Sequence, residues 1–510
     1  MNLFFRYFFL IPLLILPFEG NSQSVSTNGL VRLAPVFGSH MVLQQDKPIN
    51  IWGEAEAGTP IHVQLGQEKI LVKTDRRGKW KVEFPSRKAS FSPLSLTVND
   101  LRLEDILIGE VWLCSGQSNM HFPLKNMQTY KTVVDQLPNP NLRLYTQTAI
   151  RLVAKEGYTE KELERCNPQE FFHAAWEPSS VATASRSSAV AWLFADRLFQ
   201  KLNVPIGIIQ VALGGSAMNN WMPPVALMAN PATASLFQKD WLGNESVKLA
   251  HRERARDAFQ HVLKPGEPYF PGKMKYRWMA EPGFLFEAGI APLKPMPFRG
   301  VLWYQGESDT DSPALVSSAS TLFPSMIEEW RKYFEIGDFP FIFIQLPRFN
   351  NENWPAFREL QRRTQAELNN TQMVVTIDLG EEKEIHPKDK QPIGERATRL
   401  ALKEVYGFKE LLGFPELQKW TDNGQGLVLS FTECGTGFLP VEGEIPGFEV
   451  AGRDSIFHRA NAKFLDSHTI LLNSSVMNPE HIRYGWSAFP QPALRLFNSD
   501  NLPLGPFWVK

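Results

Sequence analysis

The chain has 510 residues, which is too long for a single hydrophobic core, so we expect two or three domains. Its 53 basic and 54 acidic side chains give a net charge of −1, which argues against a nucleic acid or another polyanion as a partner. The three cysteines are far apart and odd in number, which excludes a disulfide framework as the main source of stability.

The amino terminus has the pattern of an export signal. Arg6 supplies a positive charge, residues 7–18 form an apolar run, and the small residues at 20–22 follow as a cleavage site. The run is too short to span a bilayer comfortably, and no later stretch of the sequence reaches about 18 consecutive apolar residues. We therefore expect residues 1–23 to be a signal peptide and the mature protein to be exported, to the periplasm or out of the cell.

Residues 24–105 contain short segments that alternate apolar and polar positions and are separated by Gly, Pro and Asp turns. This spacing predicts a small antiparallel β-sandwich. No acid, base and nucleophile cluster within it, so we expect this domain to pack against a site or frame a substrate. His40 is expected to be held in a structural contact rather than to take part in chemistry.

The stretch GEVWLCSGQSNM at residues 109–120 changes abruptly from an apolar run to small and polar residues. The run predicts a buried strand, and ligands bind at the carboxyl ends of central strands in α/β proteins. Ser118 is therefore a candidate nucleophile. The alternative is that Ser118 only caps the helix that follows.

After Ser118, helix-length segments alternate with apolar runs, which predicts an α/β domain over residues 106–415. Residues 146–180 are rich in charge and proline, and we interpret them as an insertion that can line or cover an active site. The periodicity predicts helices over residues 188–202 and 355–369 and buried strands over residues 204–213, 339–346 and 373–379.

The strand at residues 204–213 ends in Gly214-Gly215-Ser216, and Trp221 follows shortly after. A double glycine lets backbone N–H groups face a ligand without interference from a Cβ atom. The Gly215 amide is therefore a candidate oxyanion donor, and the alternative is a tight turn without a chemical role.

Several short blocks resemble, in chain order, the sialate O-acetylesterase family, a branch of the SGNH hydrolases. The resemblance implies an α/β fold with an SGNH-type parallel sheet flanked by helices, an N-terminal β-sandwich and a C-terminal β domain, which we place at residues 416–510 because short strands return there. The blocks are FGSHMVLQQ at 37–45, GQSNM at 116–120, GGS at 214–216, WYQGES at 303–308, IHP at 385–387, GER at 394–396, RYGW at 483–486 and PLGPF at 503–507.

The resemblance also implies roles for the residues at the matching positions. Ser118 corresponds to the nucleophile and His386 to the general base. The oxyanion donors would be the N–H groups of Ser118 and Gly215 and the side-chain amide of Gln305. No cofactor and no metal are expected, because the sequence has no His or Cys cluster with ligand spacing.

The third member of a triad is less directly implied. Relatives usually carry Asp two residues before the histidine, and this chain carries Glu384. Glu384 is our candidate, since a carboxylate can hold the imidazole Nδ1–H. The alternatives are Asp378 or a Ser–His dyad oriented by a backbone carbonyl.

Four further residues are candidates for substrate binding: His121, Asn119, Trp221 and Glu307. His121 is only three residues from Ser118, which makes a base geometry hard to reach and suits a substrate contact better. An ionised Glu307 cannot donate a hydrogen bond, so it can also serve to hold the nucleophile loop.

These features together predict a serine esterase that removes O-acetyl groups from carbohydrates, with sialic acids as the substrate that the resemblance implies. A sialate carboxylate would require a nearby arginine, and the sequence alone assigns none. The alternatives are an esterase for acetylated xylan or another glycan, and a non-catalytic carbohydrate-binding protein that keeps the fold. The expected partner is an O-acetylated sugar or glycan, without nucleic acid or a membrane span, and the oligomeric state stays open.

Overall fold

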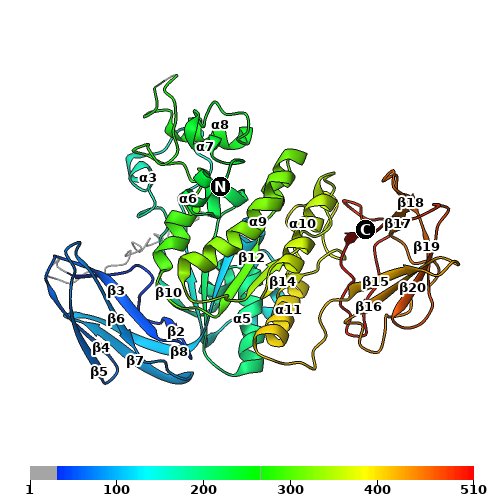
Figure 1. Ribbon diagram of the computed structural model, residues 1–510. Helices are drawn as coiled ribbons and strands as arrows, with labels where there is room; N and C mark the ends of the chain where they lie inside the picture. The colour runs from blue at the N-terminus through cyan, green and yellow to red at the C-terminus, as the bar shows by residue number, and fades with distance from the viewer. Residues whose placement is uncertain (1–30, 265) are drawn as a thin grey trace, which may run out of the picture.

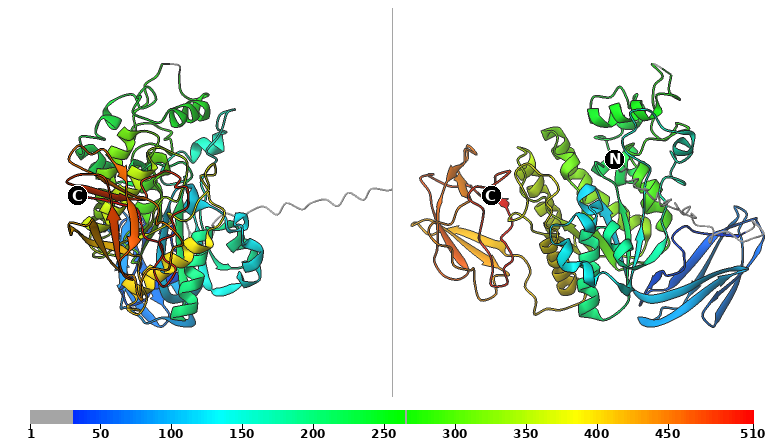
Figure 2. Two further views of the ribbon diagram at one scale, coloured as in Figure 1. Left: turned by 90° about the vertical axis from the view of Figure 1, so that its right-hand side faces the viewer. Right: turned by 180° about the vertical axis from the view of Figure 1, so that it is seen from behind.

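The computed structural model describes residues 31–264 and 266–510 (Figure 1). The signal peptide expected at residues 1–23 lies outside the described residues. The described chain forms three parts in a row, with β-strands at the amino-terminal end, an α/β part in the middle and β-strands again at the carboxyl-terminal end (Figures 1 and 2). Within these described ranges no helix combines the length and the apolar character needed to cross a membrane.

The middle part is built on a sheet with the strand order β10-β9-β11-β8-β12-β13-β14. Strand β10 is antiparallel to β9, and every other neighbouring pair runs parallel. Strands β11, β12 and β13 are buried along their whole length, as expected for a parallel sheet covered on both faces. The strands are β8 (Leu101–Gly116), β9 (Asn139–Thr146), β10 (Trp176–Ser179), β11 (Ile206–Ala212), β12 (Gly300–Tyr304), β13 (Phe341–Ile344) and β14 (Thr371–Val374).

Strand β8 belongs to two parts of the molecule at once. Its first half pairs with β7 and β2 of the amino-terminal part, and its second half pairs with β11 and β12. The domain boundary expected between residues 105 and 106 therefore falls inside a continuous strand. The remaining amino-terminal strands are β1 (Val31–Leu33), β2 (Val42–Gln44), β3 (Ile49–Ala55), β4 (Pro60–Leu65), β5 (Glu68–Lys73), β6 (Lys79–Phe84) and β7 (Ser90–Val98). His40 makes the structural contact that was expected, 2.7 Å from Asp105.

Two of the helices lie where the apolar periodicity predicts them, at residues 188–202 and 355–369. Helix α5 (Ala189–Leu202) begins where the Ser188 hydroxyl accepts a hydrogen bond from the Ala191 N–H, and it packs closely on α11 (Gln391–Leu400). Helix α9 (Pro313–Phe334) packs on α10 (Trp354–Glu367). The other α-helices are α1 (Ser118–His121), α2 (Tyr130–Val133), α3 (Glu160–Glu164), α4 (Val181–Arg186), α6 (Pro224–Ala229), α7 (Ser235–Gln238) and α8 (Leu249–Phe259).

The last strand of the middle sheet is shorter than predicted. The prediction placed it at residues 373–379, whereas β14 ends at Val374. The Thr376 hydroxyl donates to the Gln345 carbonyl at 2.7 Å, so a side-chain bond replaces the ladder there. The chain leaves the sheet early and begins the loop that carries His386.

The carboxyl-terminal part forms two four-stranded sheets, in the orders β15-β16-β20-β19 and β18-β17-β21-β22. Its first strand begins at Glu416, the residue at which we placed this domain. The buried Arg358 of α10 donates to the carbonyls of Ser487 and Ala488 and so joins the two parts. The strands are β15 (Glu416–Asp422), β16 (Leu427–Thr432), β17 (Phe448–Ala451), β18 (His458–Arg459), β19 (Asn461–Phe464), β20 (Thr469–Asn473), β21 (His481–Tyr484) and β22 (Phe507–Val509).

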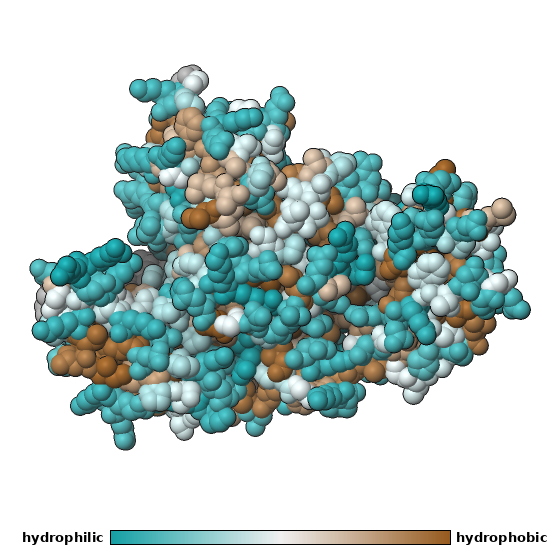
Figure 3. Space-filling view, viewed as in Figure 1, coloured by the Kyte–Doolittle hydropathy of each residue, from teal (hydrophilic) through white to brown (hydrophobic). Residues whose placement is uncertain are grey.

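The face of the molecule shown in Figure 3 is mainly hydrophilic, with apolar side chains grouped at the lower left, over the amino-terminal β-strands. The most exposed large apolar residue of those strands is Leu71 of β5, which is 63% exposed. The main apolar surface is instead buried between the sheets and helices, which is the expected source of stability for a chain of this size.

A buried ion pair links Glu110, in the second half of β8, to Arg299. The Glu110 carboxylate is fully buried and accepts two hydrogen bonds from the Arg299 guanidinium, at 2.6 and 2.8 Å. Gln45 of the amino-terminal part and Tyr406 after α11 donate to the same carboxylate. The Glu110 carboxylate therefore joins β8 to three other segments that are distant in the sequence.

We expect Arg299→Met to lower the free energy of unfolding by about 3–5 kcal/mol, because it leaves a buried carboxylate without its cation. Adding Glu110→Gln should restore part of the loss. As a control, Arg363→Ala breaks an exposed pair with Glu367 and should cost less than about 1 kcal/mol. Urea denaturation measures all three, and equal effects of Arg299→Met and Arg363→Ala would contradict this role.

Candidate active site

Three strands of the middle sheet end at the same level. Ala212 of β11 and Tyr304 of β12 both pair with Gly116, the last residue of β8. The loops that follow these strands therefore start side by side. After β8 the chain continues to β9 on one side of the sheet, whereas after β11 it continues to β12 on the other side. Ligands bind at such topological switch points in α/β sheets.

The turn after β8 requires glycine at position 116. Gly116 has a φ of +140°, and a Cβ atom on it would lie 2.1 Å from the Tyr304 carbonyl oxygen. The next residue, Gln117, donates its N–H to the same carbonyl, and its side-chain oxygen accepts from the N–H groups of Gly306 and Ser308. The loop that carries Ser118 is thus fixed to the loop after β12.

Ser118 and His386 are in hydrogen-bond contact. The Nε2 atom of His386 lies 2.8 Å from the Oγ atom of Ser118, although the two residues are 268 positions apart. Ser118 is the first residue of α1 and not its cap, so the capping alternative is wrong. Both side chains are partly exposed, which leaves the pair open to a ligand.

Glu384 lies on the other side of the imidazole. Its Oε1 atom is 3.3 Å from Nδ1 of His386 and accepts a hydrogen bond from the His386 backbone N–H at 2.9 Å. The fallback candidate Asp378 is instead bound by the Arg396 guanidinium, at 2.7 and 2.6 Å. The order Glu384, His386, Ser118 is that of a carboxylate, a base and a hydroxyl.

The protonation states also suit base chemistry. Burial lowers the pKa of His386 below its ordinary value of 6.5, Lys390 lowers it further, and Glu384 acts in the opposite direction. The His386 backbone N–H holds the pKa of Glu384 below its usual value. At neutral pH the imidazole is therefore uncharged and can accept the Ser118 proton, while the carboxylate can stabilise the imidazolium that forms.

Two backbone N–H groups at this point are free to bind an anion. The N–H groups of Ser118 and Gly215 have no hydrogen-bond acceptor within the part of the chain that the structure describes. Gly215 has a φ of +74°, and a Cβ atom on the neighbouring Gly214 would lie 3.5 Å from Cβ of Ser118. The glycine turn thus packs directly on Ser118, an arrangement that can bind a developing oxyanion.

The structure does not support Gln305 as an oxyanion donor. Its amide nitrogen donates to the Ser216 carbonyl at 3.2 Å and to the Asp309 carboxylate at 2.5 Å, so both amide hydrogens are already used. Gln305 is 1% exposed. Its observed contact with Ser216 instead holds the turn that contains Gly215.

Trp221, Asn119 and Glu307 were expected to contact a substrate, and burial contradicts this for all three. Trp221 is fully buried, packs edge-on against Trp303 and donates to the Ser216 hydroxyl at 2.9 Å. Asn119 is also fully buried, and Glu307 is 4% exposed. His121 does keep an exposed side chain, one helical turn after Ser118.

Asn119 joins the loop that carries Ser118 to the loop that carries His386. Its amide nitrogen donates to the Ile385 carbonyl at 3.0 Å and also to the Glu307 carboxylate. Its side-chain oxygen accepts from the Lys390 ammonium at 2.5 Å. Lys390 is fully buried and burial lowers its pKa to about 7. We did not predict this residue, because a lysine in the charged sequence HPKDK has the pattern of an exposed side chain.

Comparison with known proteins gives consistent results at three levels. A family model described as "Carbohydrate esterase, sialic acid-specific acetylesterase" matches residues 108–239 and 271–402. Sialate O-acetylesterases from Mus musculus and Rattus norvegicus are 27% and 28% identical to the chain over 422 and 429 residues, and each alignment covers 74% of both proteins. The crystal structure of a carbohydrate acetylesterase from Xanthomonas citri is 28% identical, with a TM-score of 0.75, and the match covers 94% of this chain and all of that one.

We expect Glu384→Gln to lower the pKa of His386 further, because it removes the negative charge that favours the imidazolium. NMR titration of the imidazole signals measures this pKa, which should lie below 6.5 already in the unmodified protein. Glu367→Gln on α10 removes an exposed carboxylate elsewhere and should leave the pKa unchanged. An unchanged or raised pKa in Glu384→Gln would show that the carboxylate does not act on the ring.

Proposed function

Because the chain belongs to the sialic acid-specific acetylesterase family of carbohydrate esterases, we propose that it removes O-acetyl groups from sialic acids through an acyl-enzyme on Ser118. The family makes the protein a carboxylic ester hydrolase for acetylated sugars. The observation that carries the mechanism is the 2.8 Å contact between Ser118 Oγ and His386 Nε2, with Glu384 behind the imidazole.

In the first step His386 Nε2 takes the Ser118 proton while Oγ attacks the carbonyl carbon of the acetyl ester. The negative charge that develops on the carbonyl oxygen is held by the free N–H groups of Ser118 and Gly215. The imidazolium, stabilised by Glu384, then gives its proton to the sugar oxygen, and the deacetylated sugar leaves.

In the second step a water molecule attacks the acetyl-serine, with His386 again taking a proton. The same two N–H groups hold the second oxyanion. When it collapses, the bond to Oγ breaks, the imidazolium returns its proton to Oγ, and acetate is released. In this mechanism Gln305 acts indirectly, because its bond to the Ser216 carbonyl fixes the turn that presents the Gly215 N–H.

We also infer an SGNH-type arrangement of the middle sheet. It is supported by the parallel strand order around β8 and by the positions of Ser118, Gly215 and His386 in loops that follow β8, β11 and β14. Loops at the carboxyl ends of parallel strands are the usual source of catalytic residues in such sheets.

We expect Ser118→Ala to reduce acetate release from an aryl acetate by on the order of 10³-fold or more, since no other group replaces the nucleophile. Ser317→Ala, an exposed serine on α9, is the control and should behave like the unmodified protein. Acetate release from O-acetylated sialic acid and from acetylated xylan identifies the sugar. Normal turnover by Ser118→Ala would refute the mechanism. Acetate release from acetylated xylan alone would refute sialic acid as the substrate.

A further inference from the structure

Two side chains of α8 approach the glycine turn from the side away from the sheet core. His251 and Arg254 are three residues apart, so they project from one face of the helix. A Cβ atom on Gly215 would lie 3.9 Å from Nη1 of Arg254 and 4.0 Å from Cε1 of His251. Because Gly214 packs on Ser118, the guanidinium lies within the reach of a single sugar bound at the nucleophile.

Both side chains lack ordinary partners. Arg254 is half-buried and makes no hydrogen bond or ion pair with the residues that the structure describes, whereas Arg252 and Arg256 of the same helix donate to the carbonyls of Val247 and Leu242. His251 is 6% exposed, and although its ring lies beside the Gly215 backbone, neither nitrogen makes a hydrogen bond of normal geometry. The buried imidazole of His251 thus has unsatisfied polar atoms, and such atoms call for a ligand or another explanation.

The local charge is positive. Lys248 at the start of α8 pairs with Asp311, so these two charges offset each other. Burial, with smaller contributions from Lys248 and Arg254, lowers the pKa of His251 to about 4, so the ring is neutral at pH 7. The Arg254 guanidinium is therefore the charge in this group that no carboxylate offsets.

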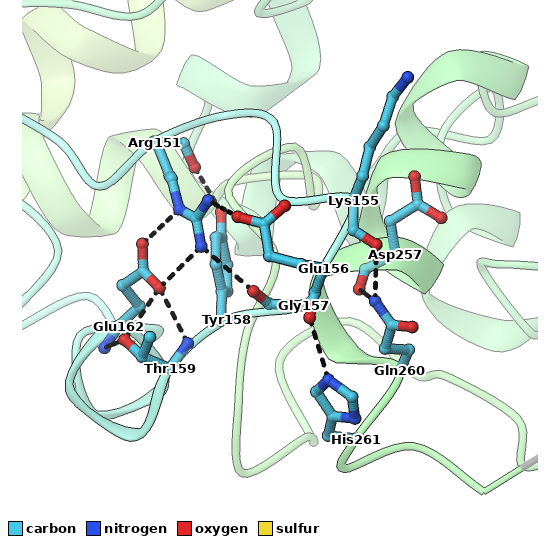
Figure 4. Close-up of polar contacts among 10 residues, drawn as sticks. All are labelled: Arg151, Lys155, Glu156, Gly157, Tyr158, Thr159, Glu162, Asp257, Gln260 and His261. Carbon is cyan, nitrogen blue, oxygen red and sulfur yellow. Dashed lines mark hydrogen bonds and ion pairs between the residues drawn. The ribbon is translucent and has the colours of Figure 1, made fainter.

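The segment at residues 146–180, which we interpreted as an insertion, bonds to the end of α8 and the residues just after it (Figure 4). The Tyr158 N–H donates to the Ala258 carbonyl at 2.8 Å, and the side chains of Gln260 and His261 bond to the carbonyls of Lys155 and Glu156 at 2.9 and 3.0 Å. The same insertion places Leu152 beside the glycine turn, where a Cβ atom on Gly215 would lie 4.0 Å from Cδ2 of Leu152. Arg151 braces the insertion through bonds to Glu156, Gly157 and Glu162.

We propose that Arg254, with His251 beside it, binds the carboxylate of an acidic sugar whose O-acetyl ester lies at Ser118. The proposal rests on the esterase function proposed above and makes Arg254 a specificity-determining residue. A guanidinium can bind both oxygens of a carboxylate, and the neutral imidazole can donate one N–H to the same group or to a hydroxyl. A neutral acetylated sugar would leave the guanidinium unpaired and would bind less well.

The test compares each acidic substrate with its methyl ester, which removes only the negative charge. For the unmodified protein we expect kcat/KM on O-acetylated sialic acid to exceed that on its methyl ester by about 10- to 100-fold. Arg254→Gln should remove this preference, and Arg254→Lys, which keeps the charge but not the planar fork, should retain part of it. Arg256→Gln removes an equal charge two residues along α8 and should keep the full preference.

An O-acetylated hexuronic acid and its methyl ester form a second arm, which distinguishes the two kinds of acidic sugar. Turnover of a neutral aryl acetate reports Ser118 chemistry separately, so its absence in the unmodified protein would refute the proposed function. Calorimetric titration with free sialic acid tests the subsite independently of catalysis, and Arg254→Gln should weaken binding by about 10- to 100-fold. Equal binding of sialic acid by Arg254→Gln and Arg256→Gln would overturn the proposal. So would the absence of a preference for the acid over its methyl ester with both kinds of acidic sugar.

Discussion

The hydrogen bond between Ser118 and His386 joins two loops that are 268 residues apart, and most of the surrounding structure serves to keep it in place. The pairing of Ala212 and Tyr304 with Gly116 brings three loops to one level of the sheet. The Asn119 side chain then fixes the backbone just before His386 by binding the Ile385 carbonyl. Such support matters because a displacement of about 1 Å between reacting groups can cost on the order of 10²-fold in rate.

The buried cluster of Asn119, Glu307 and Lys390 is costly to form. Burial raises the pKa of Glu307 and lowers that of Lys390, so each group resists being charged there. Their hydrogen bonds through Asn119 offset part of this cost. The cluster also affects the chemistry, because Lys390 adds to the lowering of the His386 pKa that burial mainly causes.

The sequence predicted several strands and helices of the middle part and the meeting of Ser118 with His386. Apolar runs that break into polar residues marked the ends of β8, β11 and β12, and Ser118 and His386 lie together as the resemblance implied. Glu384 lies beside the imidazole although it departs from the family pattern. The directions of Gln305 and Trp221 could not be predicted, because neighbouring loops decide where a side chain finds its partner. Arg254 lies in a highly charged helix whose pattern is that of an exposed one, and only the fold brings it to Gly215.

Leu152 of the segment at residues 146–180 and two side chains of α8 lie beside the Gly215 turn. The most direct test of the central claim is reaction with a fluorophosphonate, which forms a P–O bond with an activated serine and releases fluoride. Mass spectrometry should find one adduct, on Ser118, and His386→Gln should greatly slow its formation. An adduct on a different residue, or equally fast labelling without the imidazole, would contradict the account.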